Sequence, residues 1–341
     1  MSFGEREGEY FLMKAFGYYL LAITLRIVFF SANLLPESAI FNFHKKLSSL
    51  YMCSSGRYRR RIRKNLKIAF GSSYDNQDIE NITRMLTKNI GLILAETLIS
   101  GTKKKDNILD KINVHGTENL DNALSYGKGV IAISAHLGNF TLIGVKMLRE
   151  GYPFITLVKE SKHQGIAKAA RKIQRAQGGR FIYIDPWSKA LRQIISSLRK
   201  NEIVCFIADE KKRRSEIYVE FFGEPAPTAI GPAVLSLRTG APIMPIFIVR
   251  NEDLSTKIFI EPHLKLNLNG NIPEDIYTIT TAYTKVIEEY VRMYPDQWFW
   301  VNNRWKKRKI KNLKTNWRSK DIEMSFAGYK KADLIKNSMC H

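Results

Sequence analysis

Hydrophobic and polar positions along the middle of the chain fall into alternating blocks with two different periods. Short runs that are apolar throughout and rich in β-branched residues predict buried strands. They lie at 130–134, 154–158, 181–184, 203–208 and 243–249, with shorter strands at 217–221 and 257–261. Stretches with helical spacing lie between most of them, at 138–150, 165–177 and 189–200. This alternation predicts an α/β fold with a mostly parallel central sheet flanked by helices on both faces.

The first hundred residues carry helical periodicity instead. Residues 38–69 predict helical segments that follow Pro36, and residues 71–75 predict a loop. Residues 76–100 predict another helix, because their apolar positions recur every three or four residues. No internal repeat is evident, and a chain of 341 residues can form one large domain or two ordinary ones.

An apolar segment precedes these helices. Between Tyr10 and Leu35 the only charged residues are Lys14 and Arg26. A spanning helix needs about 20 mostly apolar residues, and a central arginine costs about 2.5–3.5 kcal/mol on insertion scales. We therefore predict that residues 1–35 form an N-terminal membrane-anchoring helix, lying obliquely rather than spanning cleanly. A buried core helix and a signal peptide are the alternatives, and no small-residue cleavage site supports the signal peptide.

The charge balance changes the picture of the partners. Lys and Arg total 54 against 32 Asp and Glu, which gives a net charge of +22 and attracts polyanions. The cations gather in clusters at 57–67, 211–214 and 306–314. Three such clusters beside an apolar N-terminal segment favour an anionic membrane. Nucleic acid is the weaker alternative, since the chain has no helix-turn-helix, zinc-finger or aromatic-basic RNA signature.

Composition limits the remaining classes of protein. Hydrophobic residues make up 45% and aromatic residues 11% of the chain, which argues against disorder as the main state. The three cysteines, Cys53, Cys205 and Cys340, are scattered and show neither metal-ligand spacing nor a disulfide framework. We therefore expect a reducing compartment, no metal site and no cofactor.

Candidate chemistry begins at His136. It lies in a glycine-containing turn directly after the predicted strand at 130–134. Chemistry in open α/β sheets gathers where strands end, and a histidine there can take a proton from a hydroxyl near neutral pH. A second segment, 221–233, is rich in glycine and proline and carries two aromatics, Phe221 and Phe222, that look exposed. Together these features indicate an acyltransferase that works on lipid.

An ordered series of segments strengthens this interpretation. After the apolar N-terminal segment come RRIRKNLKIAF at 60–70, SAHLGNF at 134–140, IAD at 207–209, VEFFGEPAPT at 219–228, GPA at 231–233, LRTGAPIMP at 237–245, YPDQWFW at 294–300 and NRWK at 303–306. The series resembles the bacterial late lipid A acyltransferase family, the lauroyl and myristoyl transferases, which also includes mannoside acyltransferases. The resemblance covers about residues 10–310, and the block from Phe-Phe-Gly to Ala-Pro is its most specific part. It implies a glycerolipid-acyltransferase-like domain over 36–310, followed by a basic tail over 311–341.

The resemblance also implies a reaction. A fatty acyl chain would pass from acyl carrier protein or acyl-CoA to a hydroxyl of a glycolipid, similar to a lipid A precursor, at the cytoplasmic face of the inner membrane. His136 would be the general base, without a metal and without a covalent acyl-enzyme. The family usually has a carboxylate five positions after the histidine, where this chain has Thr141. Asp209 matches a second acidic position of the family and is the expected partner of His136, with Glu210 as a spare carboxylate. Like His136, Asp209 directly follows a predicted strand, so we expect the two to meet at one edge of the sheet.

Other matched positions are candidate substrate contacts. They are Asn139, Phe222, Gly223, Thr228, Gly231 and Arg238. Each also has a structural interpretation: Asn139 as a turn residue, Phe222 as packing, the glycines as loop formers, and Arg238 as the partner of a surface acid. Asp209 itself has one too, as a cap or an ion-pair partner of the cations that follow it. Because Thr141 lacks the usual charge, the alternative function is a catalytically degenerate lipid-binding protein of the membrane surface with the same fold.

Overall fold

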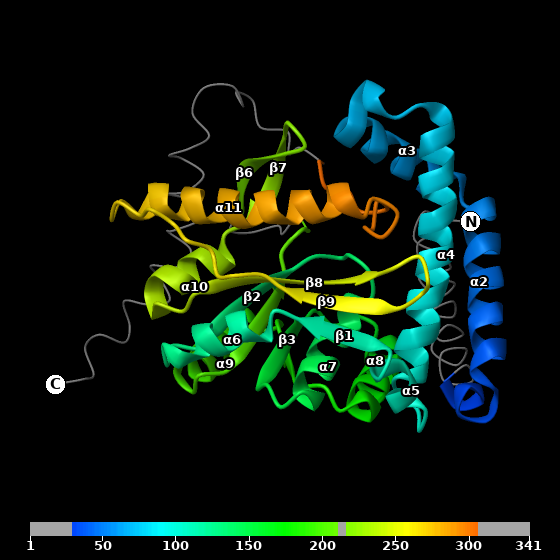
Figure 1. The fold of residues 1–341 in the computed structure, drawn as a ribbon, viewed down its shortest axis with the longest axis horizontal. Helices are drawn as coiled ribbons and strands as arrows, with labels where there is room; N and C mark the ends of the chain where they lie inside the picture. The colour runs from blue at the N-terminus through cyan, green and yellow to red at the C-terminus, as the bar shows by residue number, and fades with distance from the viewer. Residues whose placement is uncertain (1–28, 211–215, 306–341) are drawn as a thin grey trace, which may run out of the picture.

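The computed structural model describes residues 29–210 and 216–305, and a seven-stranded sheet forms its centre (Figure 1). From edge to edge the strands are β1 (Ile112–His115), β9 (Thr256–Ile260), β8 (Ile243–Arg250), β2 (Val130–Ser134), β5 (Ile203–Ile207), β3 (Phe154–Val158) and β4 (Phe181–Tyr183). The five strands from β8 to β4 run parallel, whereas β9 is antiparallel to β8 and β1 runs parallel to β9. The predicted mostly parallel central sheet is confirmed.

Helices cover both faces of the sheet and one of its ends (Figure 1). They are α2 (Glu37–Ser54), α3 (Gly56–Phe70), α4 (Asn76–Ile99), α5 (Lys105–Leu109), α6 (Thr117–Ser125), α7 (Ile143–Arg149), α8 (Gln164–Gln177), α9 (Trp187–Arg199), α10 (Gly231–Thr239) and α11 (Ile272–Met293). Residues of α9, α10 and α11 share one hydrophobic core with the sheet, and residues of α6 and α7 share the other. The helices α2, α3 and α4 form a flank at one end, with α2 outermost.

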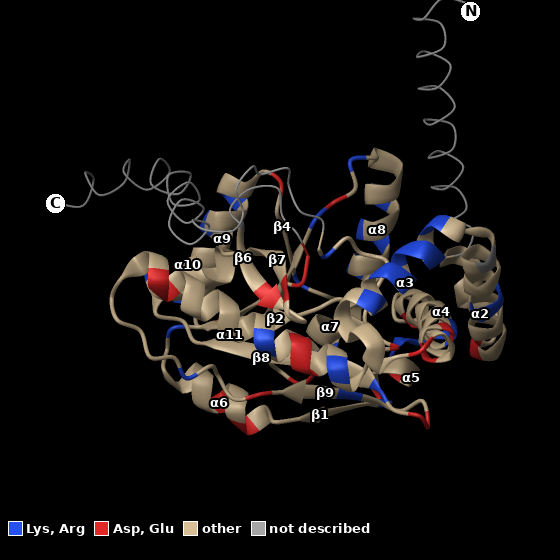
Figure 2. Ribbon diagram, turned by 90° about the horizontal axis from the view of Figure 1, so that it is seen from above, with Lys and Arg blue, Asp and Glu red and all other residues tan. Residues whose placement is uncertain are grey.

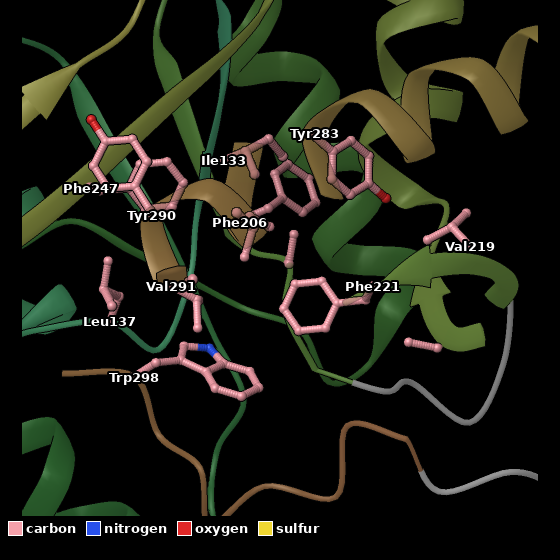
Figure 3. Close-up of a cluster of buried hydrophobic side chains, with 14 of the residues drawn as sticks. Ile133, Leu137, Phe206, Val219, Phe221, Phe247, Tyr283, Tyr290, Val291 and Trp298 are labelled. Atoms are coloured by element: carbon pink, nitrogen blue, oxygen red, sulfur yellow. The ribbon is translucent and has the colours of Figure 1, made fainter. Parts of the chain in front are cut away.

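The strand β2 shows why its sequence is apolar throughout. Ile131 and Ile133 point into the core under α9–α11, while Val130 and Ala132 point into the opposite core. A parallel strand buried on both faces has no solvent side to carry polar residues. Figure 3 shows the first core, in which Phe221 and Trp298 lie beside residues of the sheet and of α11.

The glycine- and proline-rich segment is a hairpin rather than a loop. Its strands β6 (Glu216–Phe221) and β7 (Glu224–Ala229) pair antiparallel around a two-residue turn. Phe222 and Gly223 occupy that turn with φ of 55° and 72°, the left-handed geometry that suits tight hairpins. The expectation that Phe221 and Phe222 are exposed is wrong: both are buried in the core.

Several elements differ from the sequence expectation. The strand β1 and the long helix α11 were not predicted, although Pro273 and two acids mark the first turn of α11. The helix expected over 138–150 begins later, because Gly138 takes a positive φ of 51° and residues 140–142 form a 3-10 turn before α7. The expected helical region 38–69 divides at Ser55 into α2 and α3.

The predicted anchor at 1–35 lies mostly outside the described residues, as do the basic tail at 311–341 and the cations at 211–214. Of the anchor, residues 29–34 are helical and lead to Pro36 before α2. Within 29–210 and 216–305, no helix has both the length and the hydropathy needed to cross a membrane.

Candidate active site

Two residues singled out in the sequence meet at one edge of the sheet. The strands β2 and β5 are parallel neighbours, with Ser134 opposite Ile207. His136 and Asp209 each follow their strand by two residues, so both lie beyond the carboxyl ends. This is the edge at which open α/β sheets bind ligands, and the predicted meeting of the two residues is confirmed.

Asp209 is a fully buried carboxylate with a donor on each oxygen. Its Oδ1 lies 2.8 Å from His136 Nδ1. Its Oδ2 accepts hydrogen bonds from the His136 backbone N–H at 3.0 Å and from Trp298 Nε1 at 2.7 Å. Three donors compensate for burying the charge. They also fix Asp209, which in turn orients the imidazole ring with Nδ1 facing inward.

The outer nitrogen of His136 faces the accessible side of the site. The imidazole side chain is 20% exposed, whereas the carboxylate of Asp209 is fully buried. Glu210 Oε1 lies 3.7 Å from His136 Nε2 on a half-exposed side chain. With a proton on Nδ1 donated to Asp209, Nε2 keeps a lone pair that can accept a proton from a substrate hydroxyl.

The pKa values of the pair shift in opposite directions. Burial lowers the pKa of His136, but the charge of Asp209, its hydrogen bond and the charge of Glu210 outweigh burial, so that this pKa lies above its usual value. Burial raises the pKa of Asp209, yet the charge and hydrogen bonds of His136, with the indole N–H of Trp298, bring it below its usual value. The carboxylate therefore stays charged and stabilises a protonated imidazole.

Backbone contacts hold the histidine turn against the C-terminal segment. The N–H of Phe299 donates to the His136 carbonyl at 3.0 Å, and the N–H of Gly138 donates to the Gln297 carbonyl at 3.1 Å. At Gly138, a Cβ atom would lie 2.2 Å from the carbonyl oxygen of Ile248 in β8. Only glycine permits this approach at a positive φ. The turn that carries His136 therefore depends on that glycine.

Asn139 belongs to a buried polar network beside the dyad that His136 and Asp209 form. Its Nδ2 donates to Glu96 Oε2 at 3.0 Å, and Glu96 forms a two-point ion pair with Arg250, with distances of 2.7 and 2.6 Å. Gln297 completes the network, since its side chain exchanges hydrogen bonds with both the N–H and the carbonyl of Arg250. All four residues come from different parts of the chain, and together they connect α4, β8 and the C-terminal segment behind the His136 turn.

The side chain of Thr141 belongs to this network. Its hydroxyl donates to Asn139 Oδ1 at 2.6 Å and lies 3.0 Å from the hydroxyl of Thr97. The position where the family usually has a carboxylate therefore contacts Asn139 in this chain. The carboxylate that contacts His136 comes from Asp209 instead.

The hairpin residues proposed as substrate contacts lie in the core behind the dyad. Thr228 is buried and accepts a hydrogen bond from Arg304 Nη2 at 2.6 Å. Phe222 packs against Phe70 at a ring distance of 5.3 Å and lies under the Arg292 guanidinium at 4.3 Å. Their contacts here are structural. They support Phe221, whose ring lies 5.7 Å from Trp298 (Figure 3), the residue that donates to Asp209.

Two other candidates lie away from His136. Gly223 forms the tip of the hairpin turn, and Gly231 begins α10 with open space around its Cα. Arg238 lies at the end of α10 and lines a pocket of about 290 Å³ with Lys128 and Arg199. Lys128 precedes β2, so this pocket lies at the amino edge of the sheet. Arg238 and His136 therefore do not share one site.

Sequence reasoning gave no role to Glu96, Arg250 or Trp298 in the dyad's support. Glu96 had one detectable signal: it is a single acid in the otherwise uncharged stretch 89–102, which favours a partnered buried position. Trp298 stood inside a matched segment, but nothing in that segment tells which polar group its indole reaches. Among the described residues, no group of three or more His, Cys, Asp or Glu side chains is placed to hold a metal ion.

Comparison with known proteins identifies the family of this chain. The sequence model of bacterial lipid A biosynthesis acyltransferases matches residues 7–307. The chain belongs to the bacterial lipid A biosynthesis acyltransferase family. The expected family resemblance is therefore confirmed, and the protein is an acyltransferase by class.

Curated relatives of this lipid A acyltransferase family member are similar at low identity. Phosphatidylinositol mannoside acyltransferase of Mycobacterium tuberculosis is 25% identical over 58% of this chain and 60% of its own length. Lipid A biosynthesis palmitoleoyltransferase of Escherichia coli is 25% identical over 73% of this chain and 78% of its own. Lipid A biosynthesis lauroyltransferase of the same bacterium is 22% identical over 80% and 87%. The chain thus spans less than two thirds of the mannoside enzyme and most of the two lipid A enzymes.

Proposed function

We propose that this protein transfers a fatty acyl group from an acyl thioester, carried by acyl carrier protein or coenzyme A, to a hydroxyl of a glycolipid at the cytoplasmic face of the inner membrane. The observation that carries the proposal is the hydrogen-bonded chain from Trp298 through Asp209 to His136, which leaves Nε2 on the accessible side. Family membership and the names of the relatives support an acyl acceptor that is a glycolipid.

The reaction uses His136 first as a base and then as an acid. Nε2 takes the proton of the acceptor hydroxyl while the oxygen attacks the thioester carbonyl carbon. The tetrahedral intermediate collapses with cleavage of the carbon–sulfur bond, and the protonated imidazole returns its proton to the thiolate. Asp209 stays ionised throughout and stabilises the imidazolium, as the aspartate of a hydrolytic triad does. The products are the ester and the free thiol.

The test is acyl transfer by the purified full chain and by its His136→Ala variant, with labelled acyl carrier protein or acyl-CoA and a lipid A precursor. We expect the variant to lose about 10²–10⁴-fold in turnover, which is what a positioned general base contributes, while its circular dichroism and melting temperature stay near those of the parent. Near-full turnover by the variant would refute the role of His136. If the parent binds the glycolipid without transferring an acyl group, the protein is the lipid-binding alternative that Thr141 raised.

A further inference from the structure

The exposed surface of α2 includes an apolar line, and only the last residue of this line, Tyr51, contacts another described element, the ring of Tyr58 in α3 at 5.6 Å. Phe43, Leu47, Leu50 and Tyr51 are between 46% and 68% exposed, and their spacing places them along one side of the helix. The side of the helix next to this line, with Ile40, His44, Ser48 and Met52, is buried. Four large apolar side chains in one line on a surface mark an interaction site rather than scattered exposure.

The buried side of α2 shows that this orientation is fixed. It packs on α4, where Gly91 lies so close that a Cβ would come within 2.6 Å of Ser48 Oγ and 2.9 Å of the His44 carbonyl oxygen. A close helix contact of this kind leaves little freedom to rotate α2 about its axis. The apolar line is therefore a fixed feature of the outer surface, and Figures 1 and 2 both show α2 as the outermost helix of its flank.

The charges around the line indicate what it meets. Residues 37–70 hold nine lysines and arginines and one acid, Glu37. No carboxylate of the described residues forms an ion pair with Lys46 on α2, or with Lys64 and Lys67 on α3. Figure 2 shows lysine and arginine along α3, which follows α2 at its C-terminal end. An apolar line bordered by lysine and arginine matches the interface of an anionic bilayer, where apolar side chains enter the acyl boundary and cations contact the headgroups.

The same flank adjoins the active site. Asn65 of α3 donates to the carbonyls of Trp300 and Asn302, and the neighbouring Phe299 bonds the His136 carbonyl. On α4, against which α2 packs, Glu96 accepts a hydrogen bond from Asn139, which lies three residues after His136. Hydrogen bonds from α3 and α4 therefore connect this flank to the segment and the turn that position His136.

We propose that the face of α2 formed by Phe43, Leu47, Leu50 and Tyr51 is a membrane-entry surface that lies in the interface of an anionic bilayer. It acts in addition to the predicted anchor at 1–35. The use of this surface for acyl transfer rests on the proposed function, whereas the evidence for membrane contact comes from the α2 surface itself. A second copy of this chain is a poorer occupant, because it would bring the same cations against themselves.

The test places a polarity-sensitive dye on this surface in the full chain. In a Cys53→Ser and Cys340→Ser background, Leu50→Cys is labelled with a nitrobenzoxadiazole dye. Cys205 does not compete, since it is buried in β5 and burial raises the pKa of its thiol to about 12. The matched control is Ile272→Cys, which is 49% exposed at the start of α11, at the end of the molecule remote from α2 (Figure 1).

With vesicles of phosphatidylglycerol and phosphatidylcholine, the dye at residue 50 is expected to shift to the blue and to be quenched by lipids brominated on their acyl chains. The dye at residue 272 is expected to do neither, and phosphatidylcholine alone should give a weaker response at residue 50. A water-like, unquenched dye at residue 50 on vesicle-bound protein would overturn the proposal. A dye that is already blue before vesicles are added, and that lipid quenchers do not reach, would also overturn it, because another protein segment then covers the face.

A second measurement separates this proposal from the acyl-transfer mechanism. The triple variant Phe43→Ser, Leu47→Ser and Leu50→Ser should transfer acyl groups at least about tenfold more slowly to an acceptor embedded in vesicles, because apolar burial in the interface sets the affinity. Its rate on the same acceptor in detergent micelles should equal that of the parent. Equal rates in vesicles would refute the surface. If the dye at residue 50 is quenched but the parent protein transfers no acyl group, the acyl-transfer mechanism is refuted and the membrane-entry surface is supported.

Discussion

At the residue scale, Asp209 orients His136 and raises its pKa against the effect of burial. Its carboxylate contacts the ring nitrogen, the backbone N–H and the indole of Trp298 at once. Replacing one oxygen by an amide would exchange an acceptor for a donor opposite Nδ1 and remove the charge that keeps the imidazolium stable. Comparable losses from either member of such a pair are typical, because the two act as one unit.

We therefore expect Asp209→Asn to lower turnover by about 10²–10⁴-fold, as His136→Ala does. The variant should also change the pH profile of kcat/KM. His136 is a base only when unprotonated, and its pKa lies above its usual value, so activity of the parent should rise through a midpoint above about pH 6.5. Without the Asp209 charge the pKa falls, and this midpoint should move to lower pH.

Glu210→Gln is the matched control for this profile. Glu210 also raises the pKa of His136, but through its charge alone and less than Asp209 does. It should shift the midpoint less and leave most of the turnover. A midpoint that stays in place in Asp209→Asn would show that another group controls the acid limb.

Thr141 is the second residue with a prediction of its own. Its hydroxyl donates to Asn139 Oδ1, and the amide of Asn139 donates to Glu96. A carboxylate at residue 141 would place two acceptors against each other and add negative charge near Glu96. We expect Thr141→Glu to lower stability by about 1–3 kcal/mol, the usual cost of a buried hydrogen bond left unmade, and to lower activity.

Urea denaturation measures the stability of Thr141→Glu, and acyl-transfer rates measure its activity. Thr141→Ser keeps the hydroxyl and serves as the control, with values expected near those of the parent. A gain in activity from Thr141→Glu, with Asp209→Asn indifferent, would mean that His136 depends on residue 141 as in other family members. The pairing of His136 with Asp209 would then be without catalytic importance.

At the element scale, the turn after β2 connects the sheet to the site. Gly138 combines a positive φ with an approach to β8 that excludes any side chain. Gly223, in the hairpin turn, has a positive φ but open space around it, and Gly231 at the start of α10 has neither constraint. The three glycines therefore separate steric exclusion from backbone preference.

We expect Gly231→Ala to be nearly neutral and Gly223→Ala to cost about 1–2 kcal/mol, the price of a left-handed conformation. Gly138→Ala should cost clearly more than Gly223→Ala and should abolish most activity, because the turn that carries His136 must move. Thermal unfolding and acyl-transfer assays of the three variants rank their losses of stability and activity. Equal effects at Gly138 and Gly223 would show that the contact with Ile248 is relieved without displacing the turn.

At the scale of the whole molecule, membrane contact is expected from two parts of the chain. If residues 1–28 were the entire anchor, their removal would release the protein. With the α2 surface and the neighbouring cations still present, we expect the truncated chain to bind anionic vesicles more weakly and reversibly. Raising the salt from 0.1 to 1 M shortens the Debye length from about 10 to about 3 Å, so it should release the truncated chain further.

Sedimentation with vesicles measures both effects, and the full chain at each salt concentration is the control. Complete loss of binding after truncation at low salt would show that the N-terminal segment alone holds the protein. Binding that does not respond to salt would argue against a role for the cations of α3.

Some of this architecture was readable from the sequence for a local physical reason. A sheet strand buried on both faces must be apolar along its whole length, so β2, β5 and β8 appear as apolar runs at their own positions. Parallel neighbours end at one edge, which is why His136 and Asp209 were expected to meet. In the hairpin, β6 was predicted as a strand at 217–221 but β7 was not, because its two prolines make it resemble a loop.

What the sequence determined by itself is thus the α/β class, the family and the two residues at the sheet edge. Only the tertiary structure decided what holds them: the hydrogen bond from Trp298 to Asp209 and the Glu96–Arg250 ion pair behind Asn139. It also decided that Arg238 lines a different pocket from the site of His136. Periodicity reports the environment of each residue along its own strand or helix. The partners of a buried polar group are set by how elements far apart in the chain pack together, and that packing has no local signature in the sequence.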